Sequence, residues 1–229
     1  MAFTLESIVP WGRSLEEYAR MFALSDSDLS RRILGCGDGP ASFNAEWTQR
    51  GGHVISFDPI YQYSAAQIEA RFEMVYPQML AELEKNVDDF AWDFIRSPQD
   101  LGQRRRKAKE LFIEDYQTGA AEGRYIAASL PQLPFADNTF DLALSSHFLF
   151  LYSQHLTLDF HRQSIPEMLR VAREARIFPL LQLGGAPSPY IETITRELRN
   201  IQYSVDRCKV DYEFQKGGNE MLRIWRDAT

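Results

Sequence analysis

Cysteine is scarce in this sequence, where Cys36 and Cys208 are the only two among 229 residues. Disulfides persist mainly in oxidising compartments, and a bridge at Cys36 would stiffen the glycine-rich segment around it. Long apolar runs are also missing, and none reaches the roughly eighteen residues of a membrane-spanning helix. The N-terminus has no basic start followed by an apolar stretch, the pattern of a secretory signal. We therefore expect reduced thiols, a cytoplasmic location and no membrane partner.

Positive charge is also limited, because 25 Lys and Arg residues face 32 Asp and Glu residues and give a net charge of −7. Neutralisation of phosphates supplies much of the affinity for nucleic acids, so we do not expect a nucleic-acid partner. The basic run 104–109 can meet an anionic substrate or RNA, but Glu110 and Glu114 follow it closely. That mixture favours a solvated helix face.

Metal-ligand patterns are absent as well. His155 and His161 flank a polar stretch, but no cysteine or carboxylate stands near them at a spacing typical of a metal site. We expect no metal.

The most informative motif in the sequence is a set of three glycines at alternate positions. Gly35, Gly37 and Gly39 follow a short apolar stretch and precede a helical pattern over residues 41–50. Apolar strand, glycine turn and helix together bring backbone N–H groups up to a ligand. A second predicted strand ends in Asp58, about twenty residues past the glycines, where a carboxylate can accept hydrogen bonds from both ribose hydroxyls. The pattern therefore predicts a nucleotide-type cofactor.

The spacing of the glycines separates two classes of cofactor. Nicotinamide and flavin proteins use G-x-G-x-x-G, whose third glycine permits close packing of helix on sheet, and that position is Pro40 here. The remaining G-x-G-x-G resembles the class I S-adenosylmethionine (SAM) methyltransferases. The run LPFADNTFDLALSS at 133–146 resembles that family's LPFxDxxFDLVxS segment, in the expected order. The resemblance covers residues 31–181 well and the two ends loosely.

The resemblance implies one α/β domain over residues 1–229, with a doubly wound, mostly parallel seven-stranded Rossmann-like sheet. Residues 62–123 are too long for a plain crossover, so we interpret them as a helical insertion that forms a lid on the substrate side. Residues 1–28 are predicted to form a helical cap, because Ser14 and Glu17 have the spacing of a capping box at a helix start.

The resemblance also implies which residues contact SAM. They come from the glycine loop, the end of strand 2, the end of strand 3 and the end of strand 4: Gly35, Cys36, Gly37, Asp38, Gly39, Asp58, Pro59, Ser129, Leu130 and Ser145.

Two acids in this set have alternative interpretations. Relatives carry an acid at the position of Ile33, which helps to orient the methionine end of SAM. Asp38 can replace it and hold the ammonium group, or it can cap the following helix. Asp58 can bind the ribose, or it can cap the turn before Tyr61.

The carboxyl end of strand 4 is where doubly wound sheets place ligands, and His147 follows it. His147 can act as a general base near neutral pH, or it can only pack against neighbours or cofactor. The Asn/Asp-Pro-Pro-aromatic tetrapeptide of amino-methylating enzymes is absent here, which lowers nucleic acid and glutamine as acceptors. We therefore expect methyl transfer to a small molecule, with acceptor and oligomeric state left open. The alternatives are a non-catalytic SAM-binding or regulatory protein and, less favoured, a nicotinamide enzyme.

Overall fold

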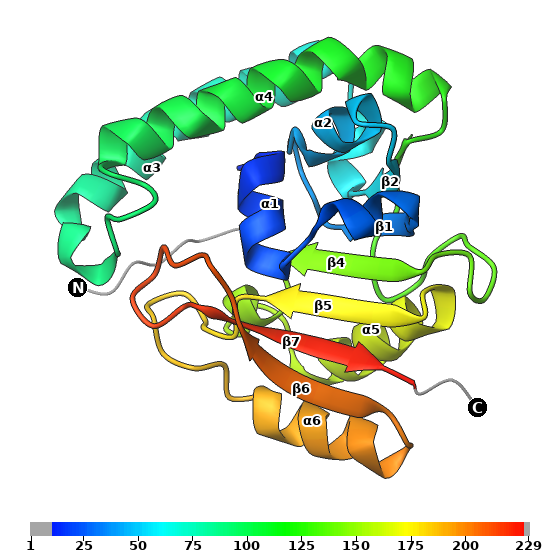
Figure 1. Ribbon diagram of the computed structural model, residues 1–229. Helices are drawn as coiled ribbons and strands as arrows, with labels where there is room; N and C mark the ends of the chain where they lie inside the picture. The colour runs from blue at the N-terminus through cyan, green and yellow to red at the C-terminus, as the bar shows by residue number, and fades with distance from the viewer. Residues whose placement is uncertain (1–10, 227–229) are drawn as a thin grey trace.

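Seven strands form one sheet in the order β3-β2-β1-β4-β5-β7-β6 in the computed structural model, which describes residues 11–226 (Figure 1). The strands are β1 Arg32–Cys36, β2 His53–Phe57, β3 Tyr125–Ile126, β4 Leu142–Ser146, β5 Glu174–Phe178, β6 Ser204–Lys209 and β7 Glu220–Trp225. Strand β7 is antiparallel to both of its neighbours, whereas the pairs among β1 to β5 are parallel. The predicted mostly parallel seven-stranded sheet is confirmed.

Helices connect most of the strands. They are α1 Leu15–Phe22, α2 Phe43–Gln49, α3 Ala65–Lys85, α4 Pro98–Ala121, α5 Leu158–Val171 and α6 Ile191–Asn200, with short 3-10 helices η1 Asp26–Ser30, η2 Pro59–Gln62, η3 Val87–Asp89 and η4 Phe150–Tyr152. Helix α1 begins where the sequence predicts, because the Ser14 hydroxyl accepts from the Glu17 N–H and the Glu17 carboxylate accepts in return from the Ser14 N–H.

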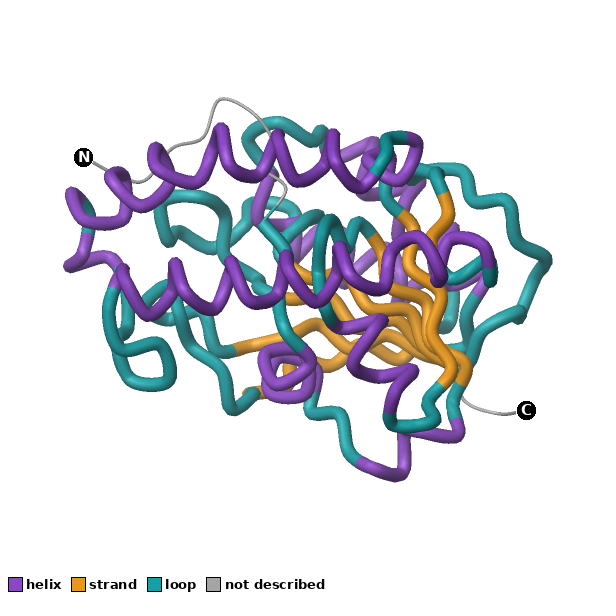
Figure 2. The backbone as a smooth tube through the Cα atoms, turned by 90° about the horizontal axis from the view of Figure 1, so that it is seen from above, coloured by secondary structure: helices purple, strands orange, loops and turns teal. Residues whose placement is uncertain are grey.

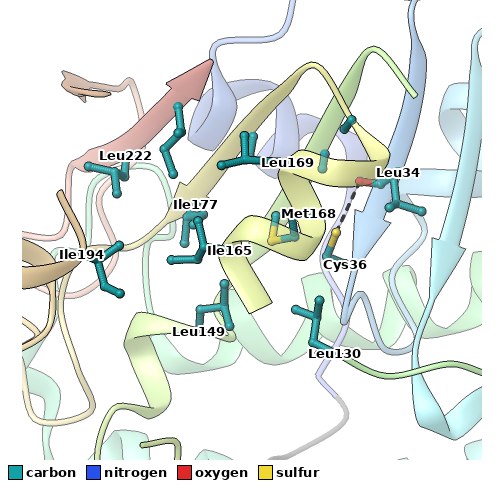
Figure 3. Close-up of a cluster of buried hydrophobic side chains, with 14 of the residues drawn as sticks. Leu34, Cys36, Leu130, Leu149, Ile165, Met168, Leu169, Ile177, Ile194 and Leu222 are labelled. Atoms are coloured by element: carbon teal, nitrogen blue, oxygen red, sulfur yellow. Dashed lines mark hydrogen bonds between the residues drawn. The ribbon is translucent and has the colours of Figure 1, made fainter. Parts of the chain in front are cut away.

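Side chains of the sheet point alternately to two apolar layers. On β4, Leu142 and Leu144 pack with α1 and α2, whereas Ala143 packs with α5 and α6. Figure 3 shows part of the second layer, where Met168 of α5 lies toward Cys36 of β1 and Ile165 of α5 lies beside Ile177 of β5. A central parallel sheet is buried on both faces, so strands β4 and β5 consist of buried residues throughout. The arrangement leaves the carboxyl ends of the strands to carry a site.

Between β2 and β3, α3 and α4 form an antiparallel pair above α1 and α2 (Figures 1 and 2). Lys109 on α4 bonds Glu69 on α3 at 2.7 Å. Gly102, nearer the start of α4, lies against Tyr76, so that a Cβ there would be 2.5 Å from the Tyr76 hydroxyl. Later residues of α4 therefore contact earlier residues of α3, which shows that the two helices are antiparallel.

The basic run 104–109 corrects one expectation. Arg105 and Lys109 are buried rather than solvated. Residues four apart lie on the same face of a helix, and this face of α4 turns inward, where Arg105 meets Glu17 and Lys109 meets Glu69. Charge counting along the sequence was wrong for these two residues, because their acidic partners lie on other helices.

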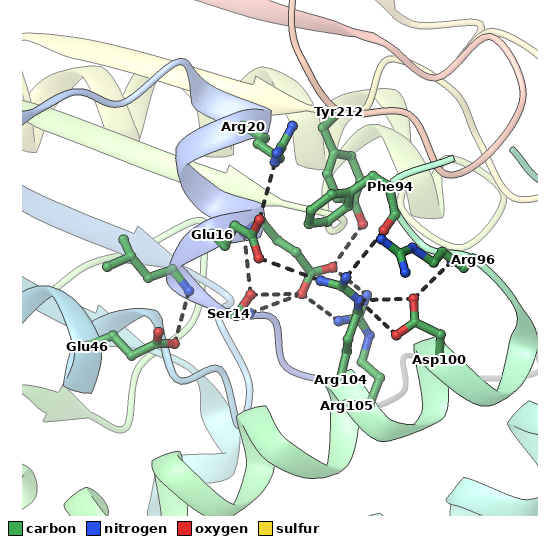
Figure 4. Close-up of polar contacts among 12 residues, drawn as sticks. Ser14, Glu16, Arg20, Glu46, Phe94, Arg96, Asp100, Arg104, Arg105 and Tyr212 are labelled. Atoms are coloured by element: carbon green, nitrogen blue, oxygen red, sulfur yellow. Dashed lines mark hydrogen bonds and ion pairs between the residues drawn. The ribbon is translucent and has the colours of Figure 1, made fainter. Parts of the chain in front are cut away.

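A buried polar cluster joins three distant segments (Figure 4). The Arg105 guanidinium donates to both carboxylate oxygens of Glu17 at 2.7 Å. The Tyr212 hydroxyl also donates to Glu17 at 2.9 Å. Burial alone raises the pKa of the Glu17 carboxyl, but Arg105 outweighs that effect and lowers the pKa to about 2. Glu17 thereby ties α1 to α4 and to the segment before β7.

Replacing Glu17 by Gln should lower the free energy of unfolding at pH 7 by ~3–5 kcal/mol, because Arg105 is left buried without its counter-charge. Urea unfolding measures the change. The wild-type advantage should fade as pH falls below about 4.5 and be lost near pH 2, since the folded-state pKa of Glu17 is lowered. Glu16→Gln, at the exposed neighbour, is the matched control and should change stability by at most ~0.5 kcal/mol. Equal effects of the two substitutions would contradict the assignment.

Candidate functional site

A cavity of about 420 Å³ opens at the carboxyl ends of β1, β2 and β4. Strands β1 and β4 are neighbours in the sheet, yet the chain leaves them toward opposite edges, to β2 and to β5. Such a switch point is where doubly wound sheets bind ligands, and the volume is typical of small-molecule sites. The predicted residues that line the cavity are Gly37, Asp38, Gly39, Asp58, Pro59, Ser129, Leu130 and His147.

The glycine loop begins the cavity. Gly37 and Gly39 have φ values of +68° and +58°, a region that side-chain-bearing residues rarely adopt. A Cβ added at Gly37 would lie 3.1 Å from the ring of Phe148, a residue that also lines the cavity. The loop is fixed to the sheet because the Gly37 N–H donates to the Phe57 carbonyl at 2.9 Å.

Asp38 folds back under this loop. Its carboxylate accepts hydrogen bonds from the Tyr18 hydroxyl and the Ser56 hydroxyl, both at 2.6 Å. A Cβ on Gly35 would lie 1.8 Å from the Asp38 carboxylate, so glycine at 35 makes this position possible. The capping alternative for Asp38 is wrong, because the N-cap of α2 is Ser42. Burial raises the pKa of Asp38 to about 7, although both hydroxyls favour the charged form.

Asp58 has the capping role, which is one of its two predicted interpretations. One carboxylate oxygen accepts from the Ile60 N–H at 2.9 Å and caps η2, and the other accepts from the Gly39 N–H at 2.9 Å. Burial raises the pKa of Asp58 to about 6 against the effect of these two donors. A carboxylate offers about four lone-pair sites, so the side chain still has acceptor capacity toward the cavity that it lines.

Three predicted residues do not line the cavity: Gly35, Cys36 and Ser145. Cys36 is a free thiol that packs in the apolar layer under α5, and burial raises its pKa well above the usual value. Ser145 points to the opposite face of β4 from Ser146, because side chains alternate along a strand. Ser146 lines the cavity in its place. The prediction for strand 4 was therefore off by one residue.

His147 has a left-handed backbone, with φ of +50°. Its N–H donates to the Phe178 carbonyl at 2.6 Å, and its Nδ1 lies 3.1 Å from the Ser146 hydroxyl. Burial, and then the charges of Arg13 and Arg105, lower the pKa of His147 well below its ordinary value. The imidazole is therefore neutral at neutral pH and can accept a proton, although its lowered pKa makes it a weaker base than an ordinary histidine.

The rest of the wall lies outside the predicted set of site residues. Tyr18 and Arg13 come from α1 and the segment before it. Met79 and Leu83 come from α3, and Phe214 from the chain between β6 and β7. The capping box at Ser14 and Glu17 places Arg13 just before a helix.

Within residues 11–226, no group of three or more His, Cys, Asp or Glu side chains could hold a metal ion. None of the described helices is long and apolar enough to cross a membrane.

Comparison with known proteins places the chain among relatives. No protein-family model matches it. The uncharacterized protein MJ0045 of Methanocaldococcus jannaschii is 36% identical over 227 residues, which cover 97% of this chain and 98% of that protein. The chain belongs to the same family as MJ0045.

Solved structures with the same fold include two at a TM-score of 0.50. Magnesium protoporphyrin IX methyltransferase (ChlM) from Synechocystis PCC 6803, with S-adenosylhomocysteine (SAH) bound, is 14% identical, and the match covers 93% of this chain and 81% of that one. The PH0226 protein from Pyrococcus horikoshii OT3 is 11% identical, with coverage of 93% and 89%. The likeness concerns the fold, which is the class I Rossmann-like SAM methyltransferase fold that the glycine spacing predicts.

The raised pKa of Asp38 should appear in the pH dependence of stability. Its folded-state value of about 7 exceeds the ordinary 3.8, so the folded state binds more protons between pH 4 and 7 and loses stability as pH rises. Relative to Asp38→Asn, the wild type should lose on the order of 4 kcal/mol across that range. Urea unfolding of both proteins measures the difference, and parallel pH curves would show that the Asp38 carboxyl titrates normally.

Proposed function

We propose that this protein is a SAM-dependent methyltransferase that acts on a small-molecule acceptor. The observation that carries the proposal is the meeting of three predicted elements at one cavity: the glycine loop, the Asp58 carboxylate and the Ser129–Leu130 segment. These elements come from the ends of β1, β2 and β3, where the resemblance puts the contacts to SAM.

The residues of the cavity suit the chemistry of SAM. Gly37 and Gly39 have backbone conformations that other residues rarely adopt, and a Cβ at Gly37 would crowd the Phe148 ring. Asp58 would accept from the ribose hydroxyls, and Ser129 and Leu130 would contact the adenine. Asp38 would stabilise the ammonium group, because a cation beside it favours the ionised carboxylate.

When bound, SAM supplies a methyl group that its sulfonium has already activated. The protein's own contribution is mainly to position the acceptor, and ideal orientation is worth up to ~7–11 kcal/mol. His147 stands at the end of β4 in neutral form, so it can accept a proton from an acceptor that is a poor nucleophile. The α3 and α4 insertion would cover the acceptor side, because Met79 and Leu83 line the cavity there.

A non-catalytic SAM-binding protein is the alternative. The departure from the family at Ile33 motivates it, and measured turnover separates the two. The cytoplasmic location stays a prediction.

Calorimetry should detect SAM and SAH binding at micromolar concentrations and no comparable binding of NADH. The glycine spacing suits SAM, whereas Pro40 occupies the position of the third glycine that nicotinamide proteins need. SAH release from a panel of small-molecule acceptors then tests catalysis. Heat from NADH with none from SAM would overturn the proposal, and SAM binding without turnover on any acceptor would favour the non-catalytic alternative.

Replacing Asp58 by Ala should weaken SAM about thirty- to a thousandfold, because hydrogen bonds to a charged group are worth ~1.5–3 kcal/mol each. The ligand-free protein should also lose ~1–2 kcal/mol of stability, since the Ile60 and Gly39 N–H groups lose their acceptor. Calorimetry and urea unfolding give the two numbers. Asp93→Ala, in an exposed loop, is the control and should change neither. Unchanged SAM affinity with reduced stability would restrict Asp58 to its capping role.

A further inference from the structure

The cavity has an apolar half on the side of the insertion. Met79 and Leu83 of α3 form one part of its wall, and Phe90 and Phe214 form another. The rings of Phe90 and Phe214 are stacked, with centroids 4.6 Å apart. This half contains none of the residues that we assign to the cofactor. It suits the apolar body of a second ligand.

Arg13 brings a positive charge to the same cavity. Its Nη1 donates to the Trp11 carbonyl at 3.0 Å, but its Nε is buried without a hydrogen-bond partner in the described part of the chain. The ion pairs among residues 11–226 do not include Arg13. A guanidinium in such surroundings is poorly solvated and calls for an anion.

Glu17 attracts Arg13 at longer range, but no carboxylate among residues 11–226 forms an ion pair with it. Glu17 is occupied by Arg105 and Tyr212. Asp38 accepts from two hydroxyls, and Asp58 from two backbone N–H groups. None of the three is within ion-pair distance of Arg13 in the described structure.

Two residues of the cavity wall, Trp11 and Gln215, each carry a buried polar atom. The Trp11 indole Nε1 is a buried donor, and the Gln215 Oε1 is a buried acceptor, both without a partner among the described residues. Buried polar atoms of native proteins are nearly always hydrogen-bonded, so the Trp11 donor points to a ligand acceptor, whereas the Gln215 acceptor requires a ligand hydroxyl or N–H group. Two donors and a cation, on Trp11 and Arg13, match the oxygens of a carboxylate.

We propose that Arg13 binds the carboxylate of the acceptor, so that the acceptor is an organic acid with an apolar body. This inference rests on the proposed function, because it assigns the second ligand of the same cavity. SAM also carries a carboxylate, which is the other source of the same chemistry. The experiment must therefore separate the two.

Matched acids and primary amides are the probes: benzoate, cinnamate, 2-naphthoate and indole-3-acetate, each with its amide. They are titrated by calorimetry into the full-length protein saturated with SAH. At least one acid should bind tenfold or more tightly than its amide, because only the acid pairs with the guanidinium. In Arg13→Met the acid should weaken at least tenfold and the amide less than threefold.

Variants control for folding and for charge. Burial and then Arg105 lower the pKa of Arg13, whereas Tyr212 and Glu17 raise it, so the melting temperature of Arg13→Met is measured beside each titration to show that the variant is folded. Arg13→Lys keeps the charge and should retain part of the preference for acids. Arg50→Met, at an exposed position, should leave every affinity unchanged.

The cofactor arm compares SAH with 5′-methylthioadenosine, which lacks the amino-acid end. If Arg13→Met weakens SAH but not 5′-methylthioadenosine, Arg13 serves the cofactor and the inference is overturned. It is also overturned if no acid binds the wild type better than its amide. Failure of SAH to bind the wild type would instead count against the proposed function, and the acid and amide titrations on ligand-free protein would still decide the role of Arg13.

Discussion

The buried pair of Glu17 and Arg105 constrains most of the walls around the cavity. Each charge is tolerable in the interior only because the other is in contact with it. The pair fixes α4 against α1, and the Tyr212 hydroxyl adds the segment before β7. Any opening of the insertion must therefore leave the middle of α4 in place or separate two buried charges. The ends of α3 and α4 around η3 are held as well, because the Ala91 N–H donates to the Phe214 carbonyl and the Lys216 N–H donates to the Asp89 carbonyl.

The glycine loop shows how an unusual acid is accommodated. Relatives place the acid before the first glycine, but Ile33 is part of the apolar layer here. Asp38 reaches a buried position from inside the loop, held by Tyr18 and Ser56. The carboxylate lies directly over Gly35, so the first glycine is needed for the acid as much as for a ligand. Burial at this position raises the pKa of the Asp38 carboxyl to about 7.

Local patterns predicted the frame of the molecule, because glycine spacing, strand periodicity and capping residues act over a few positions. They identified the sheet, the start of α1 and the placement of Asp58. Long-range pairing was beyond them: the partner of Glu17 lies 88 residues away, so Arg105 looked like part of a solvated run. Local patterns also could not fix which side chains of β4 face the cavity, because a shift of one residue decides between Ser145 and Ser146. The roles of these residues toward SAM and acceptor stay predictions.

The long separations around Glu17 bear on how the chain acquires its structure during synthesis. Arg105 follows Glu17 by 88 residues and Tyr212 by 195. Because a ribosome releases the N-terminus first, α1 emerges long before the groups that neutralise and cover its carboxylate exist. Until then Glu17 stays hydrated. Packing α1 against the sheet would bury this carboxylate without its partners, which is unfavourable. Contacts of such high order slow folding, so the walls of the cavity should be among the last parts of the molecule to become ordered.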